Sequence, residues 1–188
     1  QMGRPADGVE SFGDSSAWYQ YEDDQYEFEV KDGFMVMKGK KIDLLDQWTT
    51  APIKLKNFYL EGVFKVDDQC SDWDRYGLLV RAPKPAYGYV FTFTCGGRFR
   101  MYYMDGDKYV AVQEWKSNDA IVRGPNATNR MGVWMDGNKI KLYANGKLLG
   151  EYTDQAFTEG IIGVHLGAVD TLGLEVKVDE IQWWDLDK

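Results

Sequence analysis

The side chains best suited to bind a polar ligand are charged residues inside two predicted strands. Glu61 and Arg81 each lie in a stretch whose alternate residues are apolar. Successive side chains of a strand point to opposite faces, so both are expected to point away from the core. If the strands are neighbours, Glu61 and Arg81 pair across the sheet and offer bidentate hydrogen bonds to hydroxyl groups. The alternative is a salt bridge that only holds the strands in register.

Aromatic and basic residues further along the chain complete this predicted groove. Arg100 and Tyr102 alternate with apolar residues over 99–103, which makes them the exposed members of that strand. Trp73 in a polar loop and Trp115 at a strand end have the positions of stacking platforms at the rim of a groove. The alternative for both tryptophans is a lid over the edge of the core.

Residues for acid-base or metal chemistry are sparse. His165 is the single histidine, and a lone histidine on a strand is more often structural than catalytic. The sequence lacks the clustered His and Cys of a zinc site and the G-x-S-x-G turn of a serine hydrolase. Cys70 and Cys95 are expected to form one disulfide, which suits a secreted protein; the alternative is two buried free thiols.

Many aspartates lie in or near predicted loops. Oxygen ligands of this kind are those that calcium takes, although none of the clusters has the fixed spacing of a known metal loop. Solvated loop acids are therefore the default interpretation. These residues are Asp14, Asp23, Asp24, Asp67, Asp68, Asp72, Asp74, Asp170 and Asp179.

Composition excludes several classes of partner. The chain has 188 residues, with 30 acidic against 22 basic side chains and a formal charge of −8. Clustered Lys and Arg are needed to bind phosphates, so nucleic acid is not expected as a partner. No apolar run approaches the roughly 18 residues of a membrane span, so no membrane insertion is expected. The 7 Trp, 12 Tyr and 9 Phe exceed what a core alone requires and favour a surface that stacks on sugar rings.

Alternating residues and turn signals predict an all-β fold. The sequence Asn145-Gly146 between two alternating runs is a strong hairpin signal, since both residues tolerate positive φ. No segment has the 3.6-residue period of a helix. Short strands about 8 to 12 residues apart predict an antiparallel two-sheet sandwich. Residues 1–188 are expected to form one domain, with 1–17 an irregular lead-in in which a short strand near 9–12 is the alternative. The predicted strands cover 26–30, 34–37, 53–55, 58–66, 76–82, 87–94, 99–104, 109–115, 131–136, 139–143, 147–152, 160–166 and 174–184.

Ordered sequence pieces carry a family resemblance over most of residues 58 to 184. They are Phe58-Tyr-Leu-Glu-Gly-Val-Phe64, Tyr76-Gly-Leu-Leu-Val-Arg81, Gly88-Tyr-Val-Phe-Thr-Phe93, Arg130-Met-Gly-Val-Trp-Met-Asp-Gly-Asn138, Leu142-Tyr-Ala-Asn-Gly146, Gly160-Ile-Ile-Gly-Val164 and Val176-Lys-Val-Asp-Glu-Ile181. The chain resembles concanavalin A-like, laminin-G-like jelly rolls, close to bacterial carbohydrate-binding modules and the 3-keto-disaccharide hydrolase family.

The resemblance implies a jelly roll that holds a glycan on a concave sheet and its edge loops. It also implies a structural calcium ion, which such domains frequently hold. Retaining glucanases of this fold carry an arrangement like Glu-x-Asp-x-x-Glu, which is absent here. Because fold alone does not set function, three functions stay open at this point.

The first expectation is a non-catalytic carbohydrate-binding module of an extracellular or cell-surface bacterial protein. It would bind a polysaccharide or oligosaccharide through Glu61, Arg81, Trp73, Arg100, Tyr102 and Trp115. The second is a glycoside or keto-disaccharide hydrolase with Glu61 and His165 as acid-base groups. The third is a structural or adhesion subunit. The domain is expected either to belong to a larger parent enzyme or to associate with itself.

Overall fold

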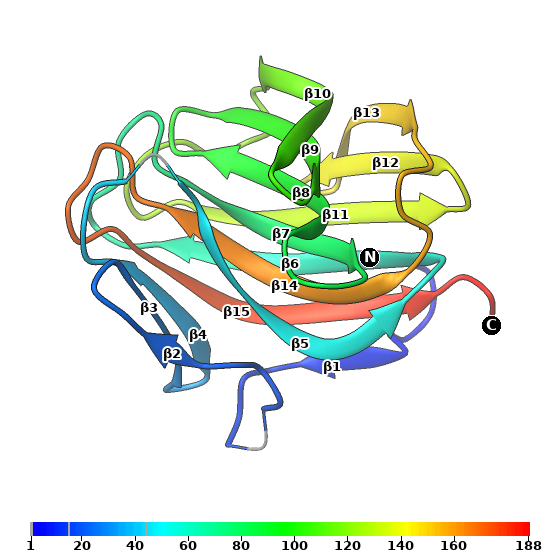
Figure 1. Ribbon diagram of the computed structural model, residues 1–188, viewed down its shortest axis with the longest axis horizontal. Helices are drawn as coiled ribbons and strands as arrows, with labels where there is room; N and C mark the ends of the chain where they lie inside the picture. The colour runs from blue at the N-terminus through cyan, green and yellow to red at the C-terminus, as the bar shows by residue number, and fades with distance from the viewer. Residues whose placement is uncertain (1, 15, 44) are drawn as a thin grey trace.

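The protein is a sandwich of two antiparallel sheets, as its computed structural model shows for residues 2–14, 16–43 and 45–188. Figure 1 shows the six-stranded sheet in front of the nine-stranded one. In spatial order, the larger sheet contains β13 (Lys147–Thr153), β12 (Lys139–Ala144), β11 (Thr128–Asp136), β6 (Phe58–Val66), β15 (Glu175–Asp185), β4 (Phe34–Gly39), β3 (Tyr26–Lys31) and β2 (Tyr21–Glu22), with β1 (Gly8–Glu10) paired to β15. The smaller sheet contains β10 (Lys108–Ser117), β9 (Arg98–Asp105), β8 (Tyr87–Thr94), β7 (Arg75–Ala82), β14 (Gly160–Gly167) and β5 (Gln47–Leu55).

The core lies between the two sheets and is rich in aromatic rings. Phe64 of β6 packs on Tyr76 of β7 with ring centroids 5.4 Å apart, and Tyr76 contacts Phe93 of β8. Burying one such side chain stabilises the fold by about 1.5–3 kcal/mol. The aromatic side of strand 87–94 is core, as its alternation predicts: Phe91 and Phe93 are fully buried. The predicted antiparallel jelly-roll sandwich is confirmed.

Turn residues close the hairpins where the sequence predicts them. Asn145 and Gly146 have φ of 52° and 82° between β12 and β13. Positive φ at both central residues is what a type I′ turn requires, and it matches the twist of the paired strands. The register of β12 and β13 therefore starts from this turn, with Ala144 opposite Lys147.

The N-terminal segment is mostly irregular and holds a short strand close to the one expected near 9–12. Residues Gly8–Glu10 form β1, in which Val9 lies opposite Gln182 of β15. Beyond it, Phe12 and Trp18 are buried, with ring centroids 5.6 Å apart. Residues 1, 15 and 44 lie outside the described part of the chain. Burial of these apolar side chains offsets the entropy that the segment loses when it becomes ordered.

A disulfide between Cys70 and Cys95 joins the β6–β7 loop to the end of β8, with Cα atoms 6.0 Å apart. This confirms the favoured pairing of the two cysteines. Among the described residues, no helix is long and apolar enough to cross a bilayer.

Candidate functional site

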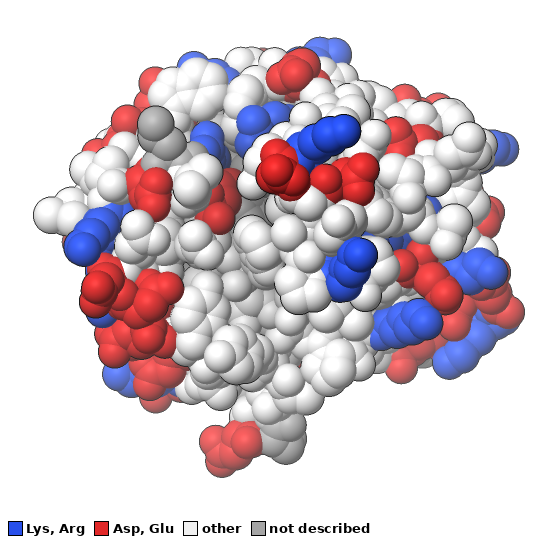
Figure 2. Space-filling view, viewed as in Figure 1, with Lys and Arg blue, Asp and Glu red and all other residues white. Residues whose placement is uncertain are grey.

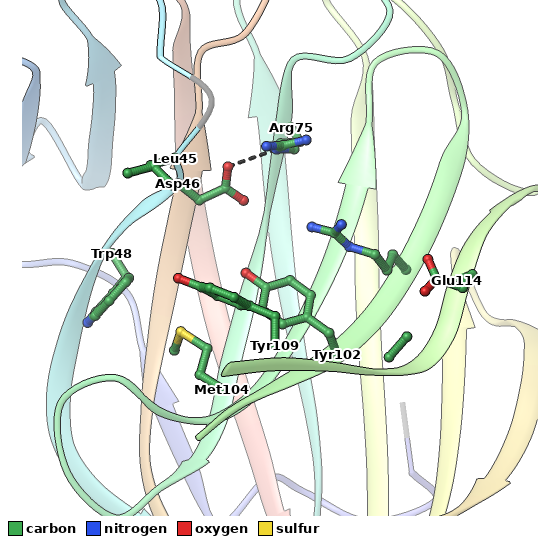
Figure 3. A pocket seen from close by; sticks show the side chains of 10 residues that line it. Leu45, Asp46, Trp48, Arg75, Tyr102, Met104, Tyr109 and Glu114 are labelled. Carbon is green, nitrogen blue, oxygen red and sulfur yellow. Dashed lines mark hydrogen bonds and ion pairs between the residues drawn. The ribbon is translucent and has the colours of Figure 1, made fainter. Parts of the chain in front are cut away.

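A pocket of about 250 Å³ lies on the outer face of the six-stranded sheet, the face turned away from the core. Figure 2 shows a hollow near the middle of the molecule in this view, and Figure 3 shows the pocket from close by. Its lining comes from the segment before β5 and from β5, β7, β9 and β10. These side chains are Leu45, Asp46, Trp48, Arg75, Arg100, Tyr102, Met104, Tyr109, Ala111 and Glu114.

A buried charge cluster forms one wall of the pocket. Arg75 Nε donates a hydrogen bond to Asp46 Oδ1 at 2.8 Å, the contact drawn as a dashed line in Figure 3. The other oxygen, Asp46 Oδ2, faces His165 Nδ1 at 3.4 Å. Burial alone disfavours the charged form of Asp46, but the contact with His165 and the charge and hydrogen bond of Arg75 outweigh it. The pKa of Asp46 is lowered, so this carboxylate is ionised at neutral pH.

The absence of a side chain at a glycine leaves space for His165 beneath the pocket. His165 is buried in β14, and its Nε2 lies 3.1 Å from the Thr92 hydroxyl. A Cβ on Gly77 of the neighbouring strand β7 would come within 2.8 Å of that nitrogen and 1.9 Å of the Phe91 carbonyl oxygen. Only glycine fits at this position, since no side chain tolerates such a backbone contact.

Arg100 provides a second positive group, held between aromatic rings. Its guanidinium carbon lies 4.5 Å from the Tyr102 ring centroid and 4.2 Å from that of Trp115. Burial lowers the pKa of Arg100, and its Nε has no hydrogen-bond partner among the described residues. A buried donor without a partner costs about 1–3 kcal/mol. An oxygen of a bound ligand would remove that cost if it reached this buried donor, and Arg100 as a binding residue stays a prediction.

Two tyrosines lie between the walls of the pocket. Figure 3 shows Tyr102 of β9 and Tyr109 of β10 between Trp48 and Glu114. Burial, together with the negative charge of Asp46, raises the pKa of Tyr102. The phenol of Tyr102 therefore stays protonated. Tyr109 is 60% exposed and contacts Tyr102 with ring centroids 5.5 Å apart.

Four of the six predicted site residues are brought together here. Arg100 and Tyr102 line the pocket. Trp115 packs on Arg100, and Trp73 meets Trp115 edge to face with centroids 5.6 Å apart. The guanidinium of Arg98 covers the Trp73 ring at 4.1 Å. The loop tryptophan and the strand tryptophan thus form one aromatic cluster beside the pocket.

The predicted pairing of Glu61 with Arg81 is wrong. Glu61 lies in β6 of the nine-stranded sheet and Arg81 in β7 of the six-stranded sheet. β6 and β7 are consecutive along the chain but belong to different sheets. Alternation within each strand does not show which strands are neighbours. Neither side chain is exposed as expected, since each has 1% of its surface accessible.

Both side chains have partners within the protein. Glu61 accepts hydrogen bonds from the Tyr59 hydroxyl at 3.0 Å and from Arg130 Nη1 at 2.8 Å. Arg81 has a left-handed φ of 50°, next to a register shift between β7 and β14. Its guanidinium donates to the backbone carbonyls of Lys56 and Gly137, both at loops. These contacts satisfy both charged side chains within the protein, so their burial is explained without a ligand.

The acid-base pair of the hydrolase interpretation is not assembled either. Glu61 belongs to the nine-stranded sheet, whereas His165 lies under the pocket on the six-stranded sheet. Sequence reasoning missed Asp46, Trp48, Arg75, Tyr109 and Glu114. A signal for His165 was available: Ile162, Val164 and Leu166 are buried in the core, so alternation turns His165 to the outer face.

Several loop aspartates have partners in the protein. Asp74 is fully buried, and its Oδ1 accepts backbone N–H bonds from Val169, Asp170 and Thr171. It thereby ties the β6–β7 loop to the loop after β14. Asp72 pairs with Arg98 at 2.7 Å. In the described part of the chain no group of three or more His, Cys, Asp or Glu side chains is arranged to hold a metal ion. Calcium binding stays a prediction.

Known structures share this fold at low sequence identity. The carbohydrate-binding module CBM66 from Bacillus subtilis is 15% identical with a TM-score of 0.67, over 89% of this chain and 96% of that one. A protein of unknown function with a galectin-like fold from Bacillus subtilis is 11% identical with a TM-score of 0.69, over 96% of both chains. A β-glucanase from Bacillus licheniformis is 13% identical with a TM-score of 0.66, over 98% and 100%.

No curated protein matches the chain by sequence. The model of the 3-keto-alpha-glucoside-1,2-lyase-like domain matches residues 7–185, which include every strand described above. The chain belongs to the 3-keto-alpha-glucoside-1,2-lyase-like domain family.

Proposed function

We propose that this protein binds one ring of a saccharide in the outer-face pocket and cleaves 3-keto-α-glucosides there by elimination across C1 and C2. One observation carries the proposal: a member of a lyase-like family places Asp46, Tyr102 and Arg100 around one pocket. The volume of about 250 Å³ lies below the roughly 300–1,000 Å³ typical of sites for drug-sized ligands, and so suits a small ring.

The reaction needs three groups around the ring. A ketone at C3 makes the C2–H acidic, so a base can remove that proton while the electron pair forms an enolate at O3. Collapse of the enolate forms the C1=C2 double bond, restores the ketone and breaks the bond from C1 to the departing oxygen. The site must therefore accept one proton, stabilise an oxyanion and supply one proton.

We assign the two proton-transfer roles from position, since Asp46 and Tyr102 both line the pocket, and from their ionisation states. Asp46, with its lowered pKa, is ionised and acts as the proton acceptor. Tyr102, with its raised pKa, stays a phenol and donates to the departing oxygen. Arg100 supports both steps, since its guanidinium is positioned to bind the enolate oxygen and lies over the Tyr102 ring. His165 is a positioning residue, because it holds Asp46 from below.

The aromatic cluster of Trp73 and Trp115 is proposed as the platform for saccharide rings that extend from the pocket on that side, as the sequence predicts. The disulfide between Cys70 and Cys95 supports an extracellular or cell-surface location. The partner is accordingly proposed to be an oligosaccharide or polysaccharide outside the cell.

Cleavage of methyl 3-keto-α-glucoside tests the lyase proposal. Wild-type protein is expected to release methanol and to form an enone, seen by its ultraviolet absorbance. Asp46→Asn and Tyr102→Phe are each expected to lower kcat about 100-fold or more, the usual contribution of one acid-base group. Glu61→Gln is the matched control, a buried carboxylate in the other sheet, and is expected to leave kcat unchanged. Full activity in Asp46→Asn would contradict the assignment.

A second candidate function is binding without catalysis. It is favoured by the similarity of the whole fold to a carbohydrate-binding module and by the orphaned Nε of Arg100 in the pocket. In that case the wild-type protein binds α-glucosides in isothermal titration, Arg100→Met weakens binding, and no enone forms. The third function, a structural or adhesion subunit, predicts instead a particle size that grows with protein concentration and no saccharide binding.

A further inference from the structure

A second hollow adjoins the pocket, and Trp48 lines both. Its volume is about 400 Å³, and its lining includes Tyr19, Tyr21, Gln47 and Thr50. Trp48 lies in β5, at the edge of the six-stranded sheet opposite β10. The two hollows therefore meet at Trp48, and the second reaches the N-terminal segment on the side away from Trp73 and Trp115.

The aromatic floor of this hollow is fixed by hydrogen bonds to β5. Tyr19 N–H donates to the Thr50 carbonyl at 3.0 Å, and the Tyr21 hydroxyl donates to the Trp48 carbonyl at 3.1 Å. The ring of Tyr21 packs on Phe28, and Tyr19 stacks on Tyr21 with centroids 5.6 Å apart. Tyr19 nevertheless remains 64% exposed. An exposed ring on a fixed backbone loses little entropy when it binds a ligand.

Charge and polarity limit what this floor accepts. The described lining of this hollow holds one carboxylate, Asp23, whose Oδ1 accepts two backbone N–H bonds. The amide of Gln47 and the hydroxyl of Thr50 offer neutral donors and acceptors beside the Tyr19 ring. A pyranose ring matches both features, because it has an apolar face of C–H bonds and a rim of hydroxyl groups. A single exposed ring would need no explanation, but here it lines a hollow that meets a pocket.

We propose that Tyr19, Tyr21 and Trp48 form a second sugar subsite. It binds the ring next to the one held in the pocket, with the ring face on Tyr19 and hydroxyls on Gln47 and Thr50. The inference rests on the proposed saccharide binding. It adds that this end of the site distinguishes saccharides by the number of sugar rings they contain. A glucoside with a small aglycone fills the pocket alone, whereas a disaccharide or longer chain fills both.

Binding of a chain-length series tests the subsite without depending on catalysis. Dissociation constants of methyl α-glucoside, maltose and maltotriose are measured by isothermal titration. Tyr19→Ala is expected to raise the Kd of maltose and maltotriose about tenfold, the contribution of one stacked ring, and to leave methyl α-glucoside unchanged. Leu172→Ala, which removes a side chain of similar exposure at 65%, is the control and is expected to change none of the three.

The outcomes separate this inference from the proposed function. Tyr19→Ala could weaken the binding of maltose and maltotriose alone while wild-type protein forms no enone from methyl 3-keto-α-glucoside. That result would support the subsite and contradict the lyase proposal. Enone formation with equal kcat/KM for methyl 3-keto-α-glucoside and 3-keto-maltose in wild type and Tyr19→Ala would keep the lyase and overturn the subsite. Equal effects of Tyr19→Ala on all three sugars, or no binding of any of them, would also overturn it.

Discussion

Buried charged side chains are stabilised in different ways at different places in this protein. Asp46 has two cationic or polar partners, Arg75 and His165, at the wall of an open pocket. Arg81 has no carboxylate among its hydrogen-bond partners in the described chain and is satisfied by backbone carbonyls. The first arrangement leaves its groups beside space for a ligand, whereas the second uses the donors of the guanidinium internally. Burial alone therefore does not separate charged side chains beside a pocket from those enclosed by the protein; their partners do.

Because Asp46 is ionised in the native protein, the free energy of unfolding depends on pH. Its native pKa is lowered from the ordinary 3.8, so its stabilisation is present above that value and is lost as the pH falls through the native pKa. Asp46→Asn is expected to cost about 3 kcal/mol at pH 7, as for a broken buried pair, and less at pH 3. Urea unfolding at several pH values measures this. A difference in the free energy of unfolding between wild type and Asp46→Asn that grows toward low pH would contradict the expectation. For the exposed-site control Asp119→Asn, this difference is expected to be independent of pH.

Arg81 and Arg100 form a matched pair for separating stability from binding. Arg81→Met leaves loop carbonyls without donors and is expected to lower the free energy of unfolding by about 3 kcal/mol, with no change in saccharide affinity. Arg100→Met relieves an unpartnered donor and is expected to weaken saccharide binding with little loss of stability. Urea unfolding and isothermal titration on both variants check this. A large binding defect in a folded Arg81→Met protein would return that residue to the site.

At the scale of elements, the site depends on strands that pack closely at its floor. Gly77 of β7 lies opposite Thr92 of β8 on one side and His165 of β14 on the other. The missing side chain of Gly77 leaves the space that the imidazole of His165 occupies. The position of His165, and through it that of Asp46, is therefore set by a neighbouring strand rather than by the strand that carries it.

Replacing Gly77 tests this dependence. Gly77→Ala forces a methyl group against the Phe91 carbonyl and the His165 ring, so we expect a loss of about 3 kcal/mol in the free energy of unfolding. The variant should also lose affinity for saccharides, because the floor of the pocket shifts. Gly13→Ala, at a position with open space around it, is the control. Equal stability of the two variants in urea would show that the close approach is not limiting.

At the scale of the whole molecule, the chain crosses repeatedly between the two sheets. The β6–β7 and β14–β15 connections are two such crossings, and Asp74 ties their loops together. The disulfide then joins the β6–β7 loop to the end of β8. One end of the sandwich is in this way fixed beside Trp73, whose backbone N–H also donates to Asp170.

Removal of the disulfide measures how much this end contributes. The bridge closes a loop with a sequence separation of 25, for which loop-closure entropy gives about 3 kcal/mol of stabilisation. The double variant Cys70→Ala/Cys95→Ala is expected to lose that amount in urea unfolding. Dithiothreitol should lower the stability of the wild type to a similar extent and leave the double variant unaffected. A loss under 1 kcal/mol would mean that the aspartate and its N–H donors hold the loops alone.

Local patterns in the sequence were enough to predict part of this arrangement. Alternation predicts the strands and identifies Arg100 and Tyr102 as outward members of β9, and Asn145-Gly146 predicts the hairpin where it lies. The same rule failed for Arg81, because a positive φ and a register shift interrupt the alternation at that residue. Alternation does not identify Asp46 either, because this residue lies just before β5 rather than within a strand.

The sequence by itself determined an antiparallel sandwich with an aromatic core, because a period of two and turn-forming residues act over a few neighbouring positions. Which strands lie side by side was decided only by the tertiary structure, through packing between residues far apart along the chain. That choice separated Glu61 from Arg81 and brought Asp46, Arg75 and Arg100 to one pocket, with His165 against Asp46 beneath it. The pocket depends on those long-range neighbours, which no local pattern encodes.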